Sequence, residues 1–253
     1  MELNFKVFGN GQPLVILHGF LGSLDNWQSL AKDFSNDFKV YLVDLRNHGK
    51  SEHASKHSYA LMSDDLREFF QQQNISNAVV LGHSMGGKTA MFLATHYPQL
   101  VDKLVVVDIG PKYYPPHHQS VLNALNSIDL NTVTSRQEVE SHLMQQLNDN
   151  NVVQWLMKNL KREGNSFQWK FNLKDLTAEI ENIGESLPED SEFHGPTLFI
   201  RGGNSNYVLD EDIENIVEHF PMVKMETIEG AAHWVYAERP QEFSAALQKF
   251  LKN

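Results

Sequence analysis

Short apolar runs alternate with longer amphipathic stretches along most of this chain. The runs are apolar at successive positions rather than at every second one, which is typical of strands buried on both faces of a sheet. We expect such strands at Leu14–Leu17, Val40–Val43, Ala78–Leu81, Leu104–Val107 and Leu198–Ile200, and a further strand-like stretch is Val223–Ile228.

The stretches between the runs predict helices at Leu24–Phe34, Ala60–Gln73, Lys88–Tyr97, Ile213–His219 and Gln241–Leu251. Strands and helices that alternate in this way assemble into a mostly parallel central sheet with helices on both faces. The pattern therefore predicts an α/β fold.

The alternation stops between residues 112 and 190, where prolines stand near both ends and no buried strand pattern appears. Helices are expected there at Ser135–Leu147 and Val152–Leu160. An ordinary helical layer of the same core is the alternative, but the interval is far longer than usual connections. We predict a core of residues 1–111 and 191–253, with residues 112–190 inserted as a helical cap.

Composition narrows the classes of function. Among 253 residues, Lys and Arg number 21 and Asp and Glu number 32, so the net charge is −11, and Cys is absent. The acidic balance argues against nonspecific nucleic-acid binding, and the absence of Cys excludes disulfides, thiolate metal sites and a Cys nucleophile. No apolar run approaches the length of a membrane span, and the first residues lack the pattern of a signal peptide. We expect a cytoplasmic globular protein without stable membrane insertion.

Residues 82–89 read Gly-His-Ser-Met-Gly-Gly-Lys-Thr and fit two motifs. Gly82-x-Ser84-x-Gly86 is the pattern of a nucleophile elbow, and Gly82-x4-Gly87-Lys88-Thr89 formally matches a phosphate-binding loop. Both motifs expect a strand before and a helix after, so the local context does not separate them.

The rest of the chain favours the elbow. Gly82 and Gly86 are small, as the close approach of strand and helix at this turn requires. The loop His18-Gly19-Phe20 follows an earlier strand and offers backbone donors. Two strand–helix units precede the motif, whereas a phosphate loop usually opens its domain. Ser84 is therefore the candidate nucleophile, and a serine hydroxyl needs a base within hydrogen-bond reach.

An acid and then a histidine must follow the serine in chain order. His233 lies in a loop of small residues after the last strand-like stretch and is the candidate base. Asp108 directly follows the strand after the elbow helix and is the preferred acid, with Asp210 and Asp212 as alternatives.

Several further positions are expected to surround this trio. Ser205 stands where the acid of such folds more often lies, and its hydroxyl is expected to bond to the ring of His233 or to Asp108. Backbone N–H groups of Phe20 and Met85 are expected to bind the oxyanion. The side chains expected to line an apolar acyl pocket are Phe20, Leu21, Met85 and Trp234.

Two further segments contain several charged residues. Asp44–Ser51 follows a strand and predicts a structural turn, because the chemistry needs no further acid. Within Asn151–Lys174, cations outnumber acids, which is typical of a solvated helix face. The alternative is contact with an anionic substrate such as a coenzyme A thioester, through Lys158, Lys161 and Arg162.

Four motifs together resemble the α/β-hydrolase superfamily: His18–Ser23, Asp44–Ser51, Gly82–Lys88 and Gly230–Trp234. Within it the chain is similar to the YbfF-type bacterial esterases, through Arg46–Gly49, Val107–Pro111, Trp169–Asn172 and Gly202–Val208. The resemblance covers essentially the whole chain. It implies an α/β-hydrolase fold with a cap, a Ser–Asp–His triad at Ser84, Asp108 and His233, and activity on short acyl esters and acyl-CoA thioesters.

The interpretation is a serine esterase that forms an acyl-enzyme and needs neither a metal nor an organic cofactor. Its partner is a small ester or thioester. Three alternatives stay open: a lyase or carbon–carbon hydrolase with the same triad, a nucleotide-binding protein that uses Lys88 and Thr89, and a scaffold that lacks catalysis. The sequence leaves the physiological substrate and the oligomeric state open.

Overall fold

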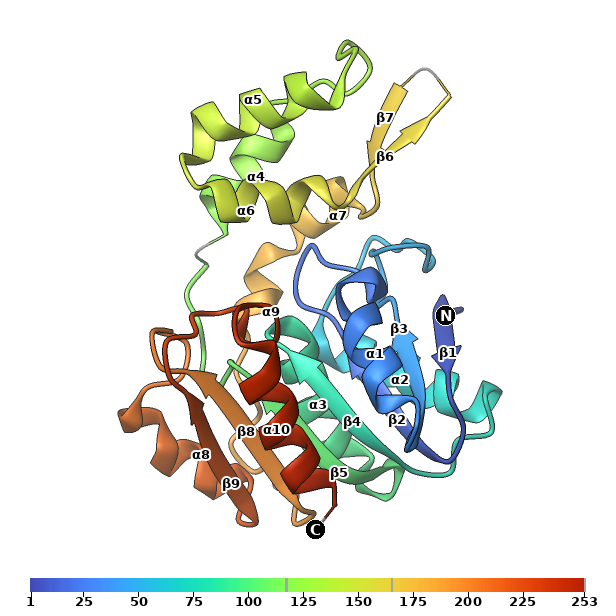
Figure 1. The fold of residues 1–253 in the computed structure, drawn as a ribbon, viewed down its shortest axis with the longest axis vertical. Coiled ribbons are helices and arrows are strands. Elements are labelled where there is room, and N and C mark those ends of the chain that lie inside the picture. Colours follow the sequence, from blue (N-terminus) through green and yellow to red (C-terminus); the bar gives the residue numbers. More distant parts are fainter. Residues whose placement is uncertain (117, 165, 253) are drawn as a thin grey trace.

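The computed structural model describes residues 1–116, 118–164 and 166–252. In this part of the chain the core is a seven-stranded sheet in the order β1-β3-β2-β4-β5-β8-β9, with β1 antiparallel to β3 and the other pairs parallel (Figure 1). The strands are β1 (Phe5–Phe8), β2 (Gln12–Leu17), β3 (Phe38–Val43), β4 (Ala78–His83), β5 (Val101–Val107), β8 (Thr197–Gly202) and β9 (Val223–Ile228). The prediction of an α/β fold with a mostly parallel sheet is confirmed.

Helices cover both faces of the sheet. The helices are α1 (Gln28–Phe34), α2 (Tyr59–Gln72), α3 (Met85–His96), α8 (Ile213–His219), α9 (Val235–Glu238) and α10 (Pro240–Leu251). Short 3-10 helices are η1 (Leu24–Trp27), η2 (Pro98–Leu100), η3 (Ile180–Gly184) and η4 (Asp210–Asp212). Residues of α1, α9 and α10 belong to one apolar cluster, and residues of α2, α3 and α8 belong to another.

The strand pattern explains these two clusters. Val15 and Leu17 of β2 face one cluster, while Leu14 and Ile16 face the other. Because successive side chains of a strand point to opposite faces, an unbroken apolar run is buried on both sides.

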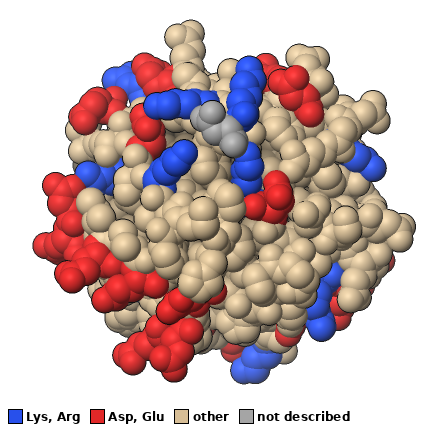
Figure 2. All heavy atoms as spheres, turned by 90° about the horizontal axis from the view of Figure 1, so that it is seen from below, with Lys and Arg blue, Asp and Glu red and all other residues tan. Residues whose placement is uncertain are grey.

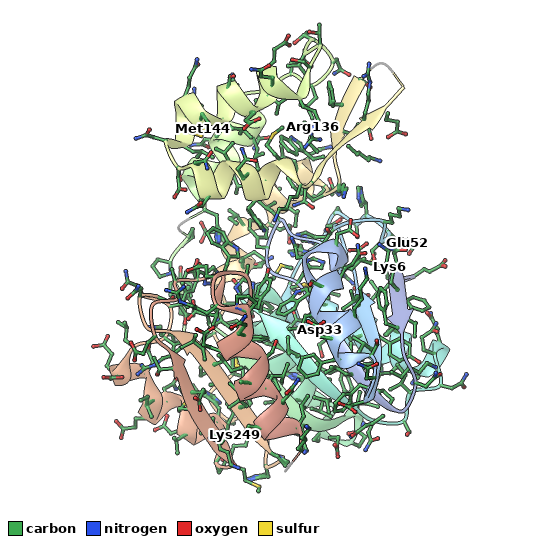
Figure 3. All side chains as sticks on the ribbon, viewed as in Figure 1. Lys6, Asp33, Glu52, Arg136, Met144 and Lys249 are labelled. Carbon is green, nitrogen blue, oxygen red and sulfur yellow. The ribbon has the colours of Figure 1, made fainter. Side chains whose placement is uncertain are left out.

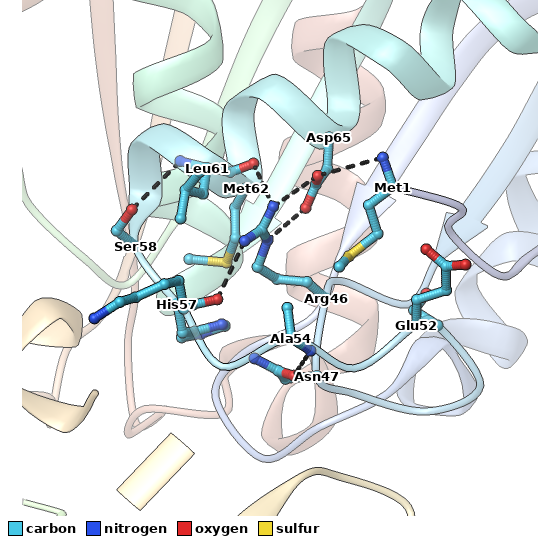
Figure 4. A network of polar contacts seen from close by, with 12 residues as sticks. Met1, Arg46, Asn47, Glu52, Ala54, His57, Ser58, Leu61, Met62 and Asp65 are labelled. Carbon is cyan, nitrogen blue, oxygen red and sulfur yellow. Dashed lines mark hydrogen bonds and ion pairs between the residues drawn. The ribbon is translucent and has the colours of Figure 1, made fainter. Parts of the chain in front are cut away.

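The segment Asp44–Ser51 forms the structural turn that its sequence predicts. Asp44 accepts hydrogen bonds from the amides of Leu24 (2.7 Å) and Lys50 (3.0 Å). The guanidinium of Arg46 is buried against the carboxylate of Asp65 in α2, at 2.5 Å from Nε (Figure 4). This ion pair joins the loop after β3 to α2.

Between β5 and β8 the chain forms α4 (Gln119–Asn126), α5 (Arg136–Leu147), α6 (Asn150–Met157), β6 (Leu160–Glu163), β7 (Ser166–Trp169) and α7 (Leu173–Ala178). These elements stand above the carboxyl ends of the sheet strands (Figure 1), and residues 119–184, apart from residue 165, are called the upper segment below. The expectation that helix formation continues to Leu160 is wrong, because that residue begins an antiparallel hairpin, β6–β7. No strand was expected there.

Two surface properties bear on partners. Among the described residues, no helix combines the length and the apolar character needed to cross a bilayer. On the face shown in Figure 2, acidic side chains gather along one side, and Lys and Arg are interspersed with acids. This face therefore offers no continuous cationic surface to a phosphate backbone.

Candidate active site

Ser84 occupies a strained turn between β4 and α3. Its backbone has φ 53° and ψ −120°, a conformation that L-residues rarely adopt. A Cβ atom on Gly82 would lie 2.1 Å from the carbonyl oxygen of Gly86, and one on Gly86 would lie 2.5 Å from the carbonyl oxygen of His18. Glycine is therefore required at both positions, and the tight turn presents the Ser84 side chain to a cavity above the sheet.

Asp108 and His233 meet at the carboxyl end of the sheet. The Nδ1 atom of His233 lies 2.8 Å from Oδ2 of Asp108, whose carboxyl group is fully buried. A carboxylate only accepts hydrogen bonds, so Nδ1 carries the proton and donates it. The other ring nitrogen, Nε2, is then the basic atom, and His233 lines the same cavity as Ser84.

Ser205 bonds to Asp108 rather than to the imidazole. Its hydroxyl donates to Oδ2 of Asp108 at 2.5 Å, and the amide of Gly202 donates to Oδ1 at 3.0 Å. Burial raises the pKa of Asp108 to about 6, while these two hydrogen bonds act in the opposite direction. The position where an acid more often stands thus carries a hydroxyl that supports the acid on the neighbouring strand.

The two alternative acids are directed to other partners. The carboxylate of Asp210 is largely exposed and pairs with Arg201 at 2.6 Å. Asp212 pairs with Lys112 at 2.7 Å and caps the amide of Leu209. Asp108 is therefore the acid that the structure brings to His233.

Two aromatic side chains that the sequence reasoning missed hold the His233 loop. The ring of Tyr207 stacks on the imidazole with centroids 3.9 Å apart and an interplanar angle of 16°. Nε2 of His83 lies 2.9 Å from the carbonyl oxygen of His233. Burial lowers the pKa of His83 to about 3, so this ring is neutral and donates from Nε2. His83 directly precedes Ser84 in the elbow motif, and this position is the sequence signal from which it could have been identified.

The loop after β2 brings backbone donors to Ser84. A Cβ atom on Gly19 would lie 3.4 Å from Cβ of Ser84, so the loop passes directly beside the hydroxyl. The amide of Leu21 donates to Nε2 of His48, whereas the amide of Phe20 has no protein partner among the described residues. Met85 begins α3, and amides in a first helical turn lack intrahelical acceptors. Both predicted oxyanion donors are thus near Ser84 with their amides available.

Ser84 and His233 share a cavity of about 260 Å³ with mainly apolar walls. Phe20, Leu21 and Trp234 line it, as expected. Met85 does not: its side chain is buried in the core, because the elbow turns it away from the cavity. The upper segment contributes Val121, Val152 and Trp155 to the walls, residues that the sequence reasoning did not single out.

The three candidate cations lie in different places. Lys158 lines an adjoining cavity of about 690 Å³ that shares Trp155 and Trp234 with the first. Lys161 pairs with Glu163 at 3.1 Å, and Arg162 lies over the ring of Phe167. Contact of Lys161 and Arg162 with the cavity beside Ser84 is not observed, because their segment is a strand of the β6–β7 hairpin and not a helix facing the sheet.

Lys88 and Thr89 contradict the hypothesis of a phosphate-binding loop. Nζ of Lys88 donates to the carbonyl oxygens of Lys112 (2.6 Å) and Glu185 (2.7 Å), and the side chain is fully buried. Burial lowers its pKa to about 7. The hydroxyl of Thr89 donates to the carbonyl oxygen of Met85. Both side chains are buried and donate to backbone carbonyl oxygens, so the match is a by-product of the glycine-rich turn.

This chain is similar to known proteins over nearly its whole length. The family model of the alpha/beta hydrolase fold matches residues 12–129. Esterase YbfF of Escherichia coli is 36% identical over 247 residues, which span 96% of this chain and 94% of that protein. An sn-1-specific diacylglycerol lipase of Danio rerio is 36% identical over 264 residues, spanning 100% of this chain and 83% of that protein. The solved structure of a marine microorganism esterase is 40% identical with a TM-score of 0.96, and the match covers 98% of this chain and 99% of that one.

Proposed function

The chain belongs to the α/β-hydrolase fold family, and on this premise we propose that it is a serine esterase with Ser84 as nucleophile, His233 as base and Asp108 as orienting acid. Its relatives are named esterase and lipase, and the chain is a hydrolase like them. The observation that carries the assignment of residues is the 2.8 Å bond between Nδ1 of His233 and Asp108, which leaves Nε2 basic in the cavity of Ser84.

Acylation follows from these positions. Nε2 of His233 takes the proton of the Ser84 hydroxyl as its oxygen forms a bond to the acyl carbon. The carbonyl oxygen becomes an oxyanion, to which the amides of Phe20 and Met85 donate. When the carbonyl re-forms, the bond to the leaving oxygen breaks, and the imidazolium gives its proton to the departing alcohol.

Deacylation repeats these steps with water. His233 takes a proton from water as the water oxygen attacks the acyl carbon, and returns it to the Ser84 oxygen as the acid leaves. Asp108 stays ionised throughout and stabilises the imidazolium of both steps. The buried bond from Ser205 supports this charge.

We further propose that residues 112–190 act as a cap that shapes the acyl site. Val121, Val152 and Trp155 of the upper segment complete the apolar walls above Ser84. The cavity volume of about 260 Å³ lies below the usual range of ligand pockets, about 300–1,000 Å³, and favours short acyl chains.

A thioester substrate with an anionic leaving group is the second candidate. Lys158 and Lys170 line the adjoining cavity together with the carboxylates of Asp25, Asp149 and Glu238. Because Lys170 pairs with Asp25 at 3.1 Å, Lys158 is the cation that would meet the leaving group. With butyryl-CoA, Lys158→Ala should raise KM several-fold and leave p-nitrophenyl butyrate hydrolysis unchanged. Lys161→Ala, on the hairpin, is the matched control and should change neither. Equal KM values for butyryl-CoA in all three proteins would exclude this role of Lys158.

The test of the esterase proposal is p-nitrophenyl butyrate hydrolysis by the wild type, Ser84→Ala and Ser63→Ala. Ser63 is a buried serine of α2 that does not line the cavity, so its variant controls for loss of a buried hydroxyl. We expect turnover by the wild type and by Ser63→Ala, and a loss of several orders of magnitude in Ser84→Ala. A folded but inert wild type would favour a lyase or carbon–carbon hydrolase instead.

A further inference from the structure

Leu21 has an unusual backbone conformation next to a proposed oxyanion donor. Its φ is 57°, in the left-handed region that a residue with a branched side chain rarely adopts. It directly follows Phe20, whose amide points to the oxyanion in the proposed mechanism. Strained residues of this kind persist only where surrounding groups hold them in place.

Both backbone polar groups of Leu21 are held by side chains distant in sequence. Its N–H donates to Nε2 of His48 at 3.1 Å, and its carbonyl oxygen accepts from Nδ2 of Asn159 at 3.0 Å. Nδ1 of His48 lies 2.8 Å from the carbonyl oxygen of Arg46 and donates to it, so Nε2 is the acceptor. His48 belongs to the core, whereas Asn159 belongs to the upper segment.

Asn159 is itself fixed between α6 and β6. Asn159 is 1% exposed. Its backbone N–H donates to the carbonyl oxygen of Leu156 at 2.9 Å, and its backbone carbonyl oxygen accepts from the N–H of Lys170 at 2.8 Å. Arg136 of α5 donates to the carbonyl oxygens of Met157, two residues before Asn159, at 2.6 Å and of Leu160, the residue after it, at 2.7 Å.

Figure 3 shows Arg136 inside the upper segment, near β6. The backbone of Asn159 is therefore fixed, and its buried side chain is oriented by Nδ2, which donates to Leu21, while Oδ1 has no partner among the described residues. The hydrogen bond to Leu21 therefore links a rigid part of the upper segment to the loop beside Ser84.

We propose that Asn159 is a positioning residue, through which the upper segment holds Leu21 and thereby aims the amide of Phe20 at the oxyanion. The inference rests on the proposed esterase function. Because the oxyanion exists only after attack on the carbonyl, loss of this bond lowers kcat and leaves KM nearly unchanged. The upper segment thus completes the catalytic loop as well as the walls of the acyl site.

A second contact between the upper segment and the core supplies the control. The backbone N–H of Asn172 donates to the backbone carbonyl oxygen of Asn47 at 2.8 Å, and its side-chain Nδ2 donates to Oδ1 of Asn47 at 3.1 Å. Asn172→Leu removes this side-chain bond, and also the bonds of the side chain to Asp175 at the start of α7, without touching Leu21. It therefore reports what general loosening of the upper segment does to the reaction.

The experiment compares the wild type with Asn159→Leu, which keeps the branching at Cγ and removes the donor, and with Asn172→Leu. Each protein is assayed for kcat and KM with p-nitrophenyl butyrate. It is also titrated with a trifluoromethyl ketone of the same chain length. This ketone adds to the serine as a hemiketal whose oxygen occupies the oxyanion site. Circular dichroism and thermal melting report folding, and Asn159→Ser, too short to reach Leu21, decides the question if Asn159→Leu does not fold.

We expect the Asn159 variant to lose about tenfold in kcat at nearly unchanged KM, and its Ki for the ketone to rise by a similar factor. This loss is smaller than that for removal of an oxyanion donor, about 100-fold or more, because the donor is misplaced and not removed. Asn172→Leu should keep both quantities within twofold. A folded Asn159 variant with kcat and Ki within twofold of the wild type overturns the inference, as does an equal loss in Asn172→Leu. Failure of the esterase proposal looks different: the wild type itself would show no Ser84-dependent turnover and no inhibition by the ketone.

Discussion

Asp108 and His233 are 125 residues apart in the chain, yet a hydrogen bond of 2.8 Å joins them. They meet because β5, β8 and β9 are parallel neighbours, so the loops that follow these strands share one edge of the sheet. Gly202 at the end of β8 permits the approach, since a Cβ atom there would lie 2.3 Å from the carbonyl oxygen of Ala232. The orientation of the imidazole thus depends on backbone packing as well as on the carboxylate.

Removing the charge of Asp108 should abolish most activity. Asp108→Asn keeps the shape, but its amide can donate to Nδ1 and so favours the wrong tautomer, with a loss in kcat of about 10⁴-fold. Asp210→Asn is the control, because that carboxylate is exposed and pairs with Arg201. Steady-state kinetics on p-nitrophenyl butyrate measure both. A loss confined to Asp210→Asn would contradict the assignment.

Ser205→Ala should shift the pH dependence of the reaction. Burial raises the pKa of Asp108 to about 6, and the bond from Ser205 lowers it, so removing the hydroxyl raises this pKa further. Activity needs the ionised acid, so the acid limb of the profile of kcat/KM should move to higher pH in the variant. Profiles from pH 5 to 9 give the answer; an unmoved limb would mean that Ser205 does not tune Asp108.

Gly82→Ala should destabilise the protein far more than Gly164→Ala. The first Cβ atom would lie 2.1 Å from the backbone of Gly86, and such overpacking costs about 3 kcal/mol or more. The second has no atom within 4 Å, and its φ of 61° costs about 1 kcal/mol. Urea denaturation measures both free energies of unfolding. Equal losses would show that the elbow is less tightly packed than the structure has it.

Lys88→Met should change how stability depends on pH. The folded pKa of about 7 lies below the ordinary value of 10.5, so between these values the unfolded chain binds a proton that the folded chain does not. Stability of the wild type relative to Lys88→Met should therefore rise with pH above 7, by at most about 1.4 kcal/mol per pH unit. Urea titrations of both proteins from pH 6 to 10 measure the difference. A constant difference would mean that the buried amine does not titrate in this range.

The sequence predicted those elements whose signal is local. Val40–Val43 and Leu104–Val107 are unbroken apolar runs, and both are buried strands. β1 was missed because it is a short edge strand with half-exposed and exposed side chains, which breaks the apolar pattern. The hairpin β6–β7 was missed, and its first residue, Leu160, was placed at the end of a helix, because its four-residue strands bear charges and exposed positions.

The candidate site divides in the same way. The sequence predicted Ser84 and His233 from contiguous motifs and Asp108 from its place after a strand, and the structure brings Asp108 to His233. Tyr207 contacts the imidazole and Asn159 contacts Leu21; both partners are distant in sequence, and no local pattern marks such contacts.

Labelling with an alkyl fluorophosphonate, followed by mass spectrometry of the intact protein and of its peptides, tests the central claim most directly. This reagent reacts with a serine activated by a neighbouring base. We predict one adduct per chain, on the peptide that contains Ser84, and none in Ser84→Ala. No adduct on the folded wild type, or an adduct on another serine that persists in Ser84→Ala, would contradict the account.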